Sequence, residues 1–402
     1  MADSPPPDIT RGPGRKRGDK SGKVADFRYK RPARPDQTRG EARPRAPRKG
    51  TAGCGPTANA GPNTHHRQAY AALDLGTNNC RLLIARPSGA DFTVIDAFSR
   101  VVRLGEGLAA SGRLSDEAMD RTLAALQVCA EKLRRRNVRL ARSVATEACR
   151  RAANGPKFIE RVKAETGIVL DIISAQEEAR LAVLGCHVLL EDGNGPAIIF
   201  DIGGGSTELV LVEPGGPVPR ILDWLSVPWG VVSLTDTVGP SDGSEEGRLE
   251  RYREMRRTVA RSFRSFAERI GEHTRSNEGI RLLGTSGTVT TLASLHLELP
   301  QYDRRAVDGL ILPSQAMRDI SARLSRMSEA DRRQLPCIGD DRANLVIAGC
   351  AILESILDIW PSVQLGVADR GIREGILRSL IAADADGERS RAAMQKMREQ
   401  DV

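Results

Sequence analysis

The chain has 402 residues, which is too long for one ordinary domain and indicates two or three folding units. Its formal charge is +8, but residues 1–67 hold 16 basic and 6 acidic residues and so carry +10, which leaves −2 for residues 68–402. The positive charge therefore belongs to one end of the chain, and the remainder is not a basic fold.

Cysteine usage and hydropathy set the compartment that we expect. Seven cysteines include no C-x-x-C pair and the histidines are few, so a structural zinc site is not indicated. The N-terminus lacks the apolar segment of a secretion signal. The most apolar late stretch, residues 345–360, is interrupted by two acidic residues and is shorter than the ~20 residues of a membrane span. We expect a cytoplasmic protein without membrane contact.

Residues 1–67 have the composition of a disordered arm. They contain ten of the 22 prolines and few branched aliphatic residues, so they cannot bury enough apolar surface to offset the entropy of ordering. Their charge would suit a polyanion such as nucleic acid. Their only two aromatic residues are too few for base stacking, and a solvated arm is the simpler interpretation.

The ordered part is predicted to begin at residue 68 with two strands around a Gly/Asn turn. A helix starting at the N-cap Ser115 has apolar residues at three-four spacing. In chain order the expected strands are 69–75, 81–85, 91–97, 141–146, 169–173, 196–202, 207–212 and 280–283, and the expected helices are 116–136, one beginning at 174, 248–270, 289–296, 344–360 and 373–383. The rest of the second half is expected to be mostly helical, with a polar tail after residue 384.

The opening strand pair is repeated later in the chain. Aligning Asp74 with Asp201 also aligns Gly76 with Gly203 and two apolar strands behind them, at an offset of 127 residues. Such a period is too long for a solenoid and indicates two copies of one α/β domain. We predict a basic tail at 1–67, a first domain at 68–193, a second at 194–384 and a polar tail at 385–402.

Two loops of similar composition end the first strand of each copy. Asp74-Leu-Gly-Thr-Asn-Asn79 and Asp201-Ile-Gly-Gly-Gly-Ser-Thr207 place an aspartate before small residues whose N–H groups can surround anionic oxygens. The aspartate can hold a divalent cation, usually through water. A third loop, Gly284-Thr-Ser-Gly-Thr288, leads into a helix, whose N-terminus favours an anion, although a tight strand-helix turn is an equal alternative.

Other glycine-rich motifs do not match. The chain lacks a G-x-x-x-x-G-K-[ST] sequence, so it has no P-loop. The loop at Gly203 leads into a strand, which argues against dinucleotide binding. The loop at Gly284 misses the G-x-S-x-G spacing of a serine hydrolase by one position.

Two adjacent glutamates begin the helix at residue 174. Ser174 and Glu177 fit a capping box, which gives Glu177 a structural role. Glu178 has no such role and is a candidate general base, although an acidic residue in a first helical turn is common.

Together these motifs resemble the exopolyphosphatase and guanosine pentaphosphate phosphohydrolase (Ppx/GppA) family of the actin-like superfamily. The likeness spans about residues 69–380. It is carried by Ala72-Leu-Asp-Leu-Gly-Thr-Asn78, Ala145-Thr-Glu-Ala-Cys-Arg150, Ile173-Ser-Ala-Gln-Glu-Glu-Ala-Arg180, Phe200-Asp-Ile-Gly-Gly-Gly-Ser-Thr-Glu-Leu209, Gly284-Thr-Ser-Gly-Thr288 and Arg373-Glu-Gly375. It implies an α/β fold of two actin-like, ribonuclease H-like domains with the active site in the cleft between them.

The resemblance also assigns the site. It implies that Glu178 activates the attacking water and that Asp74, Asp201 and Glu208 lie at a Mg²⁺ ion. The groups expected at the substrate phosphates are Gly76, Thr77, Asn78, Arg150, Gly203, Gly204, Gly205, Ser206, Thr207, Gly284 and Thr285. The implied substrate is inorganic polyphosphate, with guanosine pentaphosphate as the alternative, and a homodimer is compatible with the resemblance.

The chain departs from the family pattern in three places. Thr77 and Asn79 stand where serines are usual, residues 367–375 differ from the common Ser-Asp-Gly form, and the helical extension of longer members is absent. The rival interpretations are a kinase or ATPase of the same superfamily, a sensor that binds polyphosphate or alarmone nucleotides without turnover, and a nucleic-acid tether in the basic tail.

Overall fold

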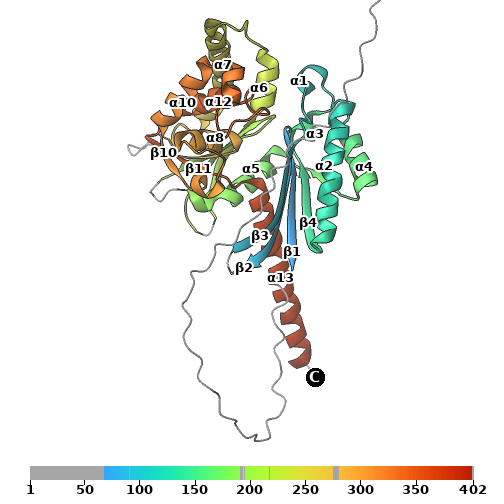
Figure 1. Ribbon diagram of the computed structural model, residues 1–402. Helices are drawn as coiled ribbons and strands as arrows, with labels where there is room; N and C mark the ends of the chain where they lie inside the picture. The colour runs from blue at the N-terminus through green and yellow to red at the C-terminus, as the bar shows by residue number, and fades with distance from the viewer. Residues whose placement is uncertain are drawn as a thin grey trace, which may run out of the picture.

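The computed structural model describes residues 68–400 except 90, 191–192, 194, 217 and 275–279, with side chains as far as residue 387. The predicted basic tail, residues 1–67, lies outside the described residues. Figure 1 shows two lobes, each built on one β-sheet. No helix within the described ranges combines the length and the apolar character that a bilayer crossing needs.

The first sheet has five strands in the order β3-β2-β1-β4-β5. The first three strands form an antiparallel meander, and β4 and β5 continue the sheet parallel to β1. The strands are β1 (Ala69–Leu75), β2 (Asn79–Ser88), β3 (Asp91–Val101), β4 (Val138–Ala145) and β5 (Leu170–Ile172).

The second sheet repeats this topology in the order β10-β11-β9-β6-β7-β8. Here β6, β7 and β8 form the antiparallel meander, β9 and β11 run parallel to β6, and β10 is an additional antiparallel edge. The strands are β6 (Ala197–Ile202), β7 (Thr207–Glu213), β8 (Arg220–Val227), β9 (Arg281–Thr285), β10 (Ile311–Pro313) and β11 (Gln364–Ala368). The predicted repeat is confirmed, because Asp74 and Asp201 are each the last residue but one of equivalent strands.

The helices cover both faces of each sheet. On the first sheet, α2 and α4 cover one face, and α5 and α13 cover the other. Helices α7, α8, α10 and α12 form the main core with one face of the second sheet. The helices are α1 (Leu108–Ser111), α2 (Asp116–Arg135), α3 (Glu147–Arg151), α4 (Gly155–Thr166), α5 (Ala175–Cys186), α6 (Val231–Val238), α7 (Glu245–Ile270), α8 (Gly287–His296), α9 (Arg304–Val307), α10 (Ser314–Arg326), α11 (Glu329–Arg333), α12 (Val346–Ile359) and α13 (Ile372–Gln400), and a short 3₁₀ helix spans His187–Leu189.

Most predicted elements are confirmed, and the differences lie in the second half. Ser115 caps α2 by accepting a hydrogen bond from the Ala118 amide, as predicted. Strands β8, β10 and β11 were not predicted. The polar tail predicted after residue 384 has a helical backbone, because α13 continues to Gln400. This stretch is polar, yet its alanine, arginine, glutamate and methionine residues all favour a helix.

Helix α5 lies between the two sheets and packs on both. Leu181 and Ala182 belong to the apolar cluster on the first sheet. Val183 and Cys186 belong to the cluster on the second sheet. One short helix therefore fixes the position of one sheet relative to the other.

Helix α13 packs against α5 through glycines. A Cβ atom on Gly185 of α5 would clash with the carbonyl oxygen of Gly371, and a Cβ atom on Gly375 would clash with that of Leu181. The two backbones approach this closely because neither glycine has a side chain.

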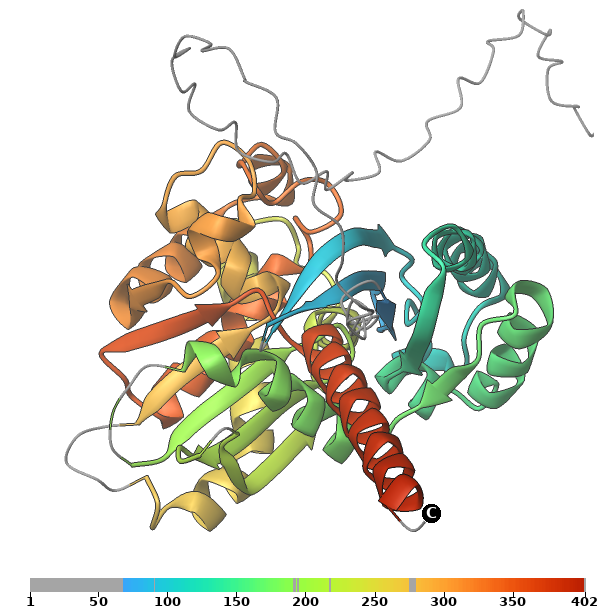
Figure 2. The same ribbon diagram turned by 90° about the horizontal axis from the view of Figure 1, so that it is seen from below.

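The last helix belongs to the core of the first sheet. Figure 2 shows α13 passing between the two lobes. Its Ile376 and Leu377 join the cluster on β1, and the Tyr70 hydroxyl donates a hydrogen bond of 2.6 Å to Asp384. The second domain predicted at 194–384 thus includes a helix that packs on the first sheet, and the domain boundaries remain a prediction.

We predict that Gly185→Ala destabilises the protein by about 1–3 kcal/mol, because an added methyl group forces apart the α5 and α13 backbones. Urea unfolding of the purified variant would measure this loss. Gly287→Ala is the matched control, since a Cβ atom there meets nothing closer than 3.8 Å. An unchanged midpoint for Gly185→Ala would show that the helices can separate without cost.

Candidate active site

The first loop follows β1 and is fixed through its carbonyl groups. The Gly76 amide donates to the Asn79 carbonyl at 2.9 Å. The segment at residues 102–105 donates to the loop, from Val102 to the Asn78 carbonyl and from Gly105 to the Thr77 carbonyl, both at 2.9 Å. In the part of the chain that the structure describes, the Thr77 and Asn78 amides donate to no protein acceptor.

The second loop follows β6 and has the same design. Its Gly203 and Gly204 carbonyls accept hydrogen bonds from Val231 and Val232 at the start of α6, at 2.9 and 2.8 Å. The Ser233 hydroxyl donates to the Gly205 carbonyl at 3.0 Å.

The amides of the second loop are left without partners. Among the described residues, no protein acceptor takes the N–H groups of Gly204, Gly205 and Ser206. Both loops thus direct their carbonyls to the protein scaffold and keep successive N–H groups free, which is how a backbone binds phosphate oxygens.

The two loops touch each other across the interface between the sheets. A Cβ atom on Gly204 would lie 3.0 Å from the Thr77 Cβ and 3.1 Å from the Asn78 nitrogen, and one on Gly205 would lie 2.5 Å from the Thr77 hydroxyl. Only glycine permits this approach. The two loops are therefore in direct contact in this structure.

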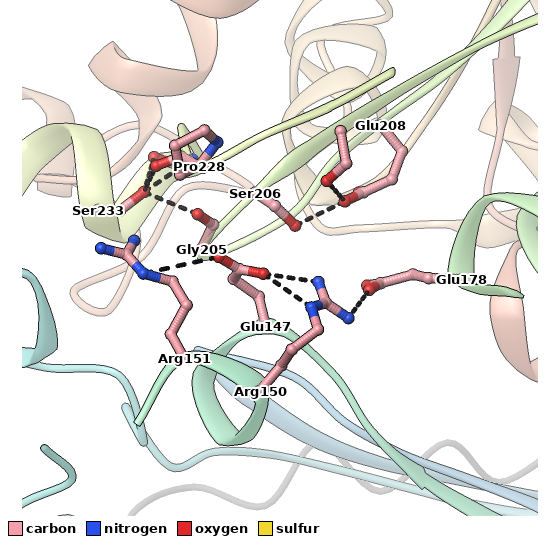
Figure 3. A network of polar contacts seen from close by, with 11 residues as sticks. Glu147, Arg150, Arg151, Glu178, Gly205, Ser206, Glu208, Pro228 and Ser233 are labelled. Atoms are coloured by element: carbon pink, nitrogen blue, oxygen red, sulfur yellow. Dashed lines mark hydrogen bonds and ion pairs between the residues drawn. The ribbon is translucent and has the colours of Figure 1, made fainter. Parts of the chain in front are cut away.

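Glu178 faces this interface from the first turn of α5 (Figure 3). Its side chain is buried, and its Oε2 atom accepts a hydrogen bond of 3.1 Å from Arg150. Arg150 also binds Glu147, with a shortest distance of 2.6 Å, and donates to the Ile173 carbonyl at 2.8 Å. Arg150 therefore holds Glu178 in place, and the phosphate contact expected of it stays a prediction.

Glu208 lies in β7 beside the second loop (Figure 3). Its Oε1 atom accepts hydrogen bonds from the Ser206 and Ser226 hydroxyls, at 2.6 and 2.9 Å. Only 2% of the side chain is exposed, so the carboxyl group depends on these two donors and on any cation nearby.

Burial and like charge raise the pKa values of the carboxyl groups at the interface. Burial raises the pKa of Asp201 to about 6. The positive charge of Arg81 lowers this pKa, and the negative charge of Asp74 raises it. Burial and the charge of Asp201 raise the pKa of Glu208 to about 7.

Glu178 is affected in the same way. Burial, with the charges of Glu208 and Asp74, raises its pKa well above the usual range, and the charge of Arg150 opposes the shift. A carboxylate whose pKa is moved toward neutrality is a better proton acceptor than an ordinary glutamate.

The donor set fits a divalent cation held largely through water. Within the described ranges, no three carboxylate, thiol or imidazole groups come close enough to bind one ion directly. Glu208 is nevertheless buried, Asp74 and Asp201 are half-buried, and Asp74 Oδ1 has no hydrogen-bond partner. A cation with its own water shell would satisfy these oxygens and offset their repulsion.

The structure brings four of the predicted site residues together. Asp74, Asp201, Glu178 and Glu208 converge with both loops at one interface. Glu147, Arg81 and Ser226 were not predicted. The pairing of Asp74 with Arg81 across the first turn could have been read from the sequence, because opposite residues of a hairpin lie on the same face.

Three of the residues predicted to bind phosphate have other contacts in this structure. Gly284 is buried inside β9, where a Cβ atom would clash with the Phe200 ring, and its backbone pairs with the neighbouring strands. The Thr285 hydroxyl donates to the Arg370 carbonyl at 2.7 Å and the Thr207 hydroxyl to the Trp229 carbonyl at 2.6 Å. These groups contact the protein itself in this structure, and the phosphate contacts expected of them stay predictions.

The predicted capping box is correct in one half only. The Ser174 hydroxyl accepts the Glu177 amide at 3.2 Å, as expected. The Glu177 carboxylate does not reach back to the cap and instead pairs with Arg180 and Arg142, at 2.7 and 2.9 Å. Two accessible arginines satisfy a carboxylate better than one backbone amide.

Known proteins resemble this chain over nearly all of its described length. The Ppx/GppA phosphatase family model matches residues 83–383. Exopolyphosphatase 2 of Mycobacterium tuberculosis (strain CDC 1551 / Oshkosh) is 30% identical over 324 residues, which cover 77% of this chain and 98% of that protein.

Solved structures give the same picture. The crystal structure of the Ppx/GppA family member from Aquifex aeolicus is 28% identical, covers 79% of this chain and 98% of its own, and superposes with a TM-score of 0.65. An exopolyphosphatase from Cytophaga hutchinsonii has a TM-score of 0.69 at 24% identity, over 79% of this chain and 98% of that one, and supports the fold alone.

We predict that Arg150→Gln moves the rising limb of the pH–rate profile to higher pH by about 1–3 units. The positive charge of Arg150 lowers the pKa of Glu178, so its removal leaves Glu178 protonated over a wider range. Initial rates of phosphate release across pH would show the shift. Arg151→Gln is the control, because Arg151 lies 3.8 Å from Glu147 and makes no ion pair with Glu178; an unshifted profile for Arg150→Gln would contradict the assignment.

We predict that Glu208→Gln stabilises the metal-free protein more at pH 8 than at pH 5. The folded pKa of Glu208 is raised, so its carboxyl group favours folding at low pH and this contribution is lost as pH rises toward about 7. Glutamine does not ionise, so the variant does not lose this stability as pH rises. Its free energy of unfolding at pH 8 should exceed that of the wild type by on the order of 1.4 kcal/mol per unit of pKa shift. Urea unfolding in chelator at both pH values measures it, and an equal effect at both would contradict the pKa shift.

Proposed function

The chain belongs to the Ppx/GppA phosphatase family and is a phosphoanhydride hydrolase of the exopolyphosphatase type, and from this premise we propose that it is a Mg²⁺-dependent enzyme that releases the terminal phosphate of inorganic polyphosphate. The observation that supports this most is the position of Glu178. It is a buried carboxylate with a raised pKa, held by Arg150 beside two loops whose N–H groups are free.

The chemistry follows from these groups. Free amides of both loops bind the oxygens of the terminal phosphate and align it for in-line attack. Water attacks this phosphorus, its proton passes to Glu178, and the bond to the bridging oxygen breaks, so that phosphate leaves and the chain is one unit shorter. Such a base contributes on the order of 10²–10⁴ in rate.

The cation would lie among Asp74, Asp201 and Glu208. When bound, it offsets the charge of the carboxylates and of the phosphate oxygens. Arg150 has a separate task, because it keeps Glu178 oriented and favours its ionised form, while Glu147 holds the Arg150 guanidinium group in place.

A phosphate-release assay on long-chain polyphosphate and on guanosine pentaphosphate, side by side, tests the proposal. We expect release from polyphosphate in Mg²⁺ without any acceptor, and little in chelator. Preference for guanosine pentaphosphate would support the alternative substrate. Phosphate transfer only to an added acceptor would indicate a kinase, and the absence of turnover on both would favour a sensor.

We predict that Glu178→Gln lowers kcat on the order of 10²–10⁴-fold while substrate still binds, since the amide keeps the shape and loses the basicity. Glu177→Gln is the matched control from the same helical turn, because Glu177 only pairs with surface arginines. Steady-state kinetics of both variants provide the comparison. A larger loss for Glu177→Gln would mean that the two roles are reversed.

A further inference from the structure

A cavity of about 230 Å³ lies in the second lobe and shares no residue with the described site. It lies between the start of α7, the end of α10, helix α11 and the segment that leads into α12. Figure 1 shows α7, α10 and α12 grouped in that lobe. The charged residues of its lining are Arg248, Arg251, Glu329 and Arg332. Three cations and one carboxylate give the cavity a positive charge.

The three arginines lack carboxylate partners. In the part of the chain that the structure describes, neither Arg248 nor Arg251 nor Arg332 makes an ion pair. Their Nε atoms donate to backbone carbonyls instead, which are in turn those of Arg326 at 2.8 Å, Gly239 at 2.5 Å and Ala343 at 2.8 Å. A carbonyl group orients a guanidinium group but does not neutralise its charge.

Each of these arginines also keeps donors to spare. Among the described residues, no acceptor takes the Nη2 atoms of Arg248 and Arg332 or either Nη atom of Arg251. A guanidinium group carries five N–H donors in a planar fork that matches the oxygens of a phosphate. The cavity therefore has more charged donors around it than its own walls satisfy.

Arg332 carries the largest cost of this arrangement, because only 4% of it is exposed. Burial lowers its pKa, and the charge of Glu329 opposes this shift. The charges of Arg251 and Arg248 lower the pKa further. Glu329 offsets the three cations only in part, since it also pairs with Arg333. A buried cation is stable when an anion accompanies it, so an anion in the cavity would remove the repulsion.

The volume of the cavity restricts the ligand. About 230 Å³ is smaller than the roughly 300–1,000 Å³ of pockets that hold drug-sized molecules. A nucleotide is therefore too large, whereas a single phosphate ion fits. Phosphoanhydride hydrolysis releases orthophosphate, so this anion is present wherever the enzyme acts.

Helix α6 separates the cavity from the catalytic loops. The N–H groups at its start donate to the Gly203 and Gly204 carbonyls of the second loop. The Gly239 carbonyl, just past its other end, accepts the hydrogen bond from Arg251. A helix of eight residues is about 12 Å long, so Arg251 contacts the protein one helix length away from that loop.

We propose that Arg248, Arg251 and Arg332 form a binding site for orthophosphate, the product of the reaction, outside the catalytic cleft. Their guanidinium groups share its oxygens in charge-assisted hydrogen bonds. The catalytic loops present backbone amides to phosphate, and this site presents side chains that the reaction does not use. The two sites can therefore be separated by substitution.

Arg251→Gln tests the site, because Arg251 has a single hydrogen bond to the protein and its loss disturbs the fold less than that of Arg332. Equilibrium dialysis against orthophosphate in chelator, with potassium chloride keeping the ionic strength constant, counts the bound phosphate. We expect the wild type to bind one phosphate that the variant binds about 10- to 100-fold more weakly, since a hydrogen bond to a charged group is lost. Arg251→Lys keeps the charge and should restore part of the binding.

Arg261→Gln is the matched control, since Arg261 lies on the same helix, is exposed and does not line the cavity. Initial rates at low phosphate should be the same for Arg251→Gln and the wild type. An equal phosphate count in the two proteins would overturn the proposal. An equal loss in Arg261→Gln would overturn it as well, because surface charge would explain the binding. Loss of activity together with binding would place the phosphate at the catalytic loops. The count holds whichever phosphoanhydride the enzyme prefers, so failure of polyphosphate as a substrate leaves this result decisive.

Discussion

The packing of α5 between the two sheets is the constraint on which the rest of the structure depends. One side of the helix is buried against the first sheet and the other against the second. Its first turn therefore lies where the two phosphate loops meet, and a side chain placed there can act on a group held by both. Gly185 sets how closely α5 approaches the backbone at Gly371, and Arg150 holds the Glu178 side chain.

The site concentrates negative charge before any substrate arrives. Four carboxyl groups share a buried interface, and burial is the first cause of each raised pKa. Such an arrangement is costly in a protein without ligands, since desolvated like charges repel. Under the proposed function, a cation bound with its phosphate partner would offset this repulsion.

The sequence predicted the site residues that lie in short motifs, and it missed the contacts that form between segments far apart in the chain. The repeat at Asp74 and Asp201, the two loops and Glu178 lie in local patterns with fixed spacing, and all of them meet at the interface. Gly284 was predicted to lie in a loop because the sequence Gly-Thr-Ser-Gly-Thr is typical of a loop. It lies in β9 instead, where it pairs with β6 and with β11, and β11 was not predicted.

The return of α13 to the first sheet affects how the protein is made. Tyr70 and Asp384 are 314 positions apart and share a hydrogen bond, and Ile376 fills the same cluster as residues of β1. During synthesis, α5 covers only part of this face of the first sheet, and nearly the whole chain must be made before α13 can close the rest. At about 5–20 residues per second this interval lasts on the order of 15–60 seconds, in which an exposed apolar surface invites aggregation or chaperone binding. A nascent chain stalled before residue 372 would therefore hold a complete second sheet beside an incomplete first one.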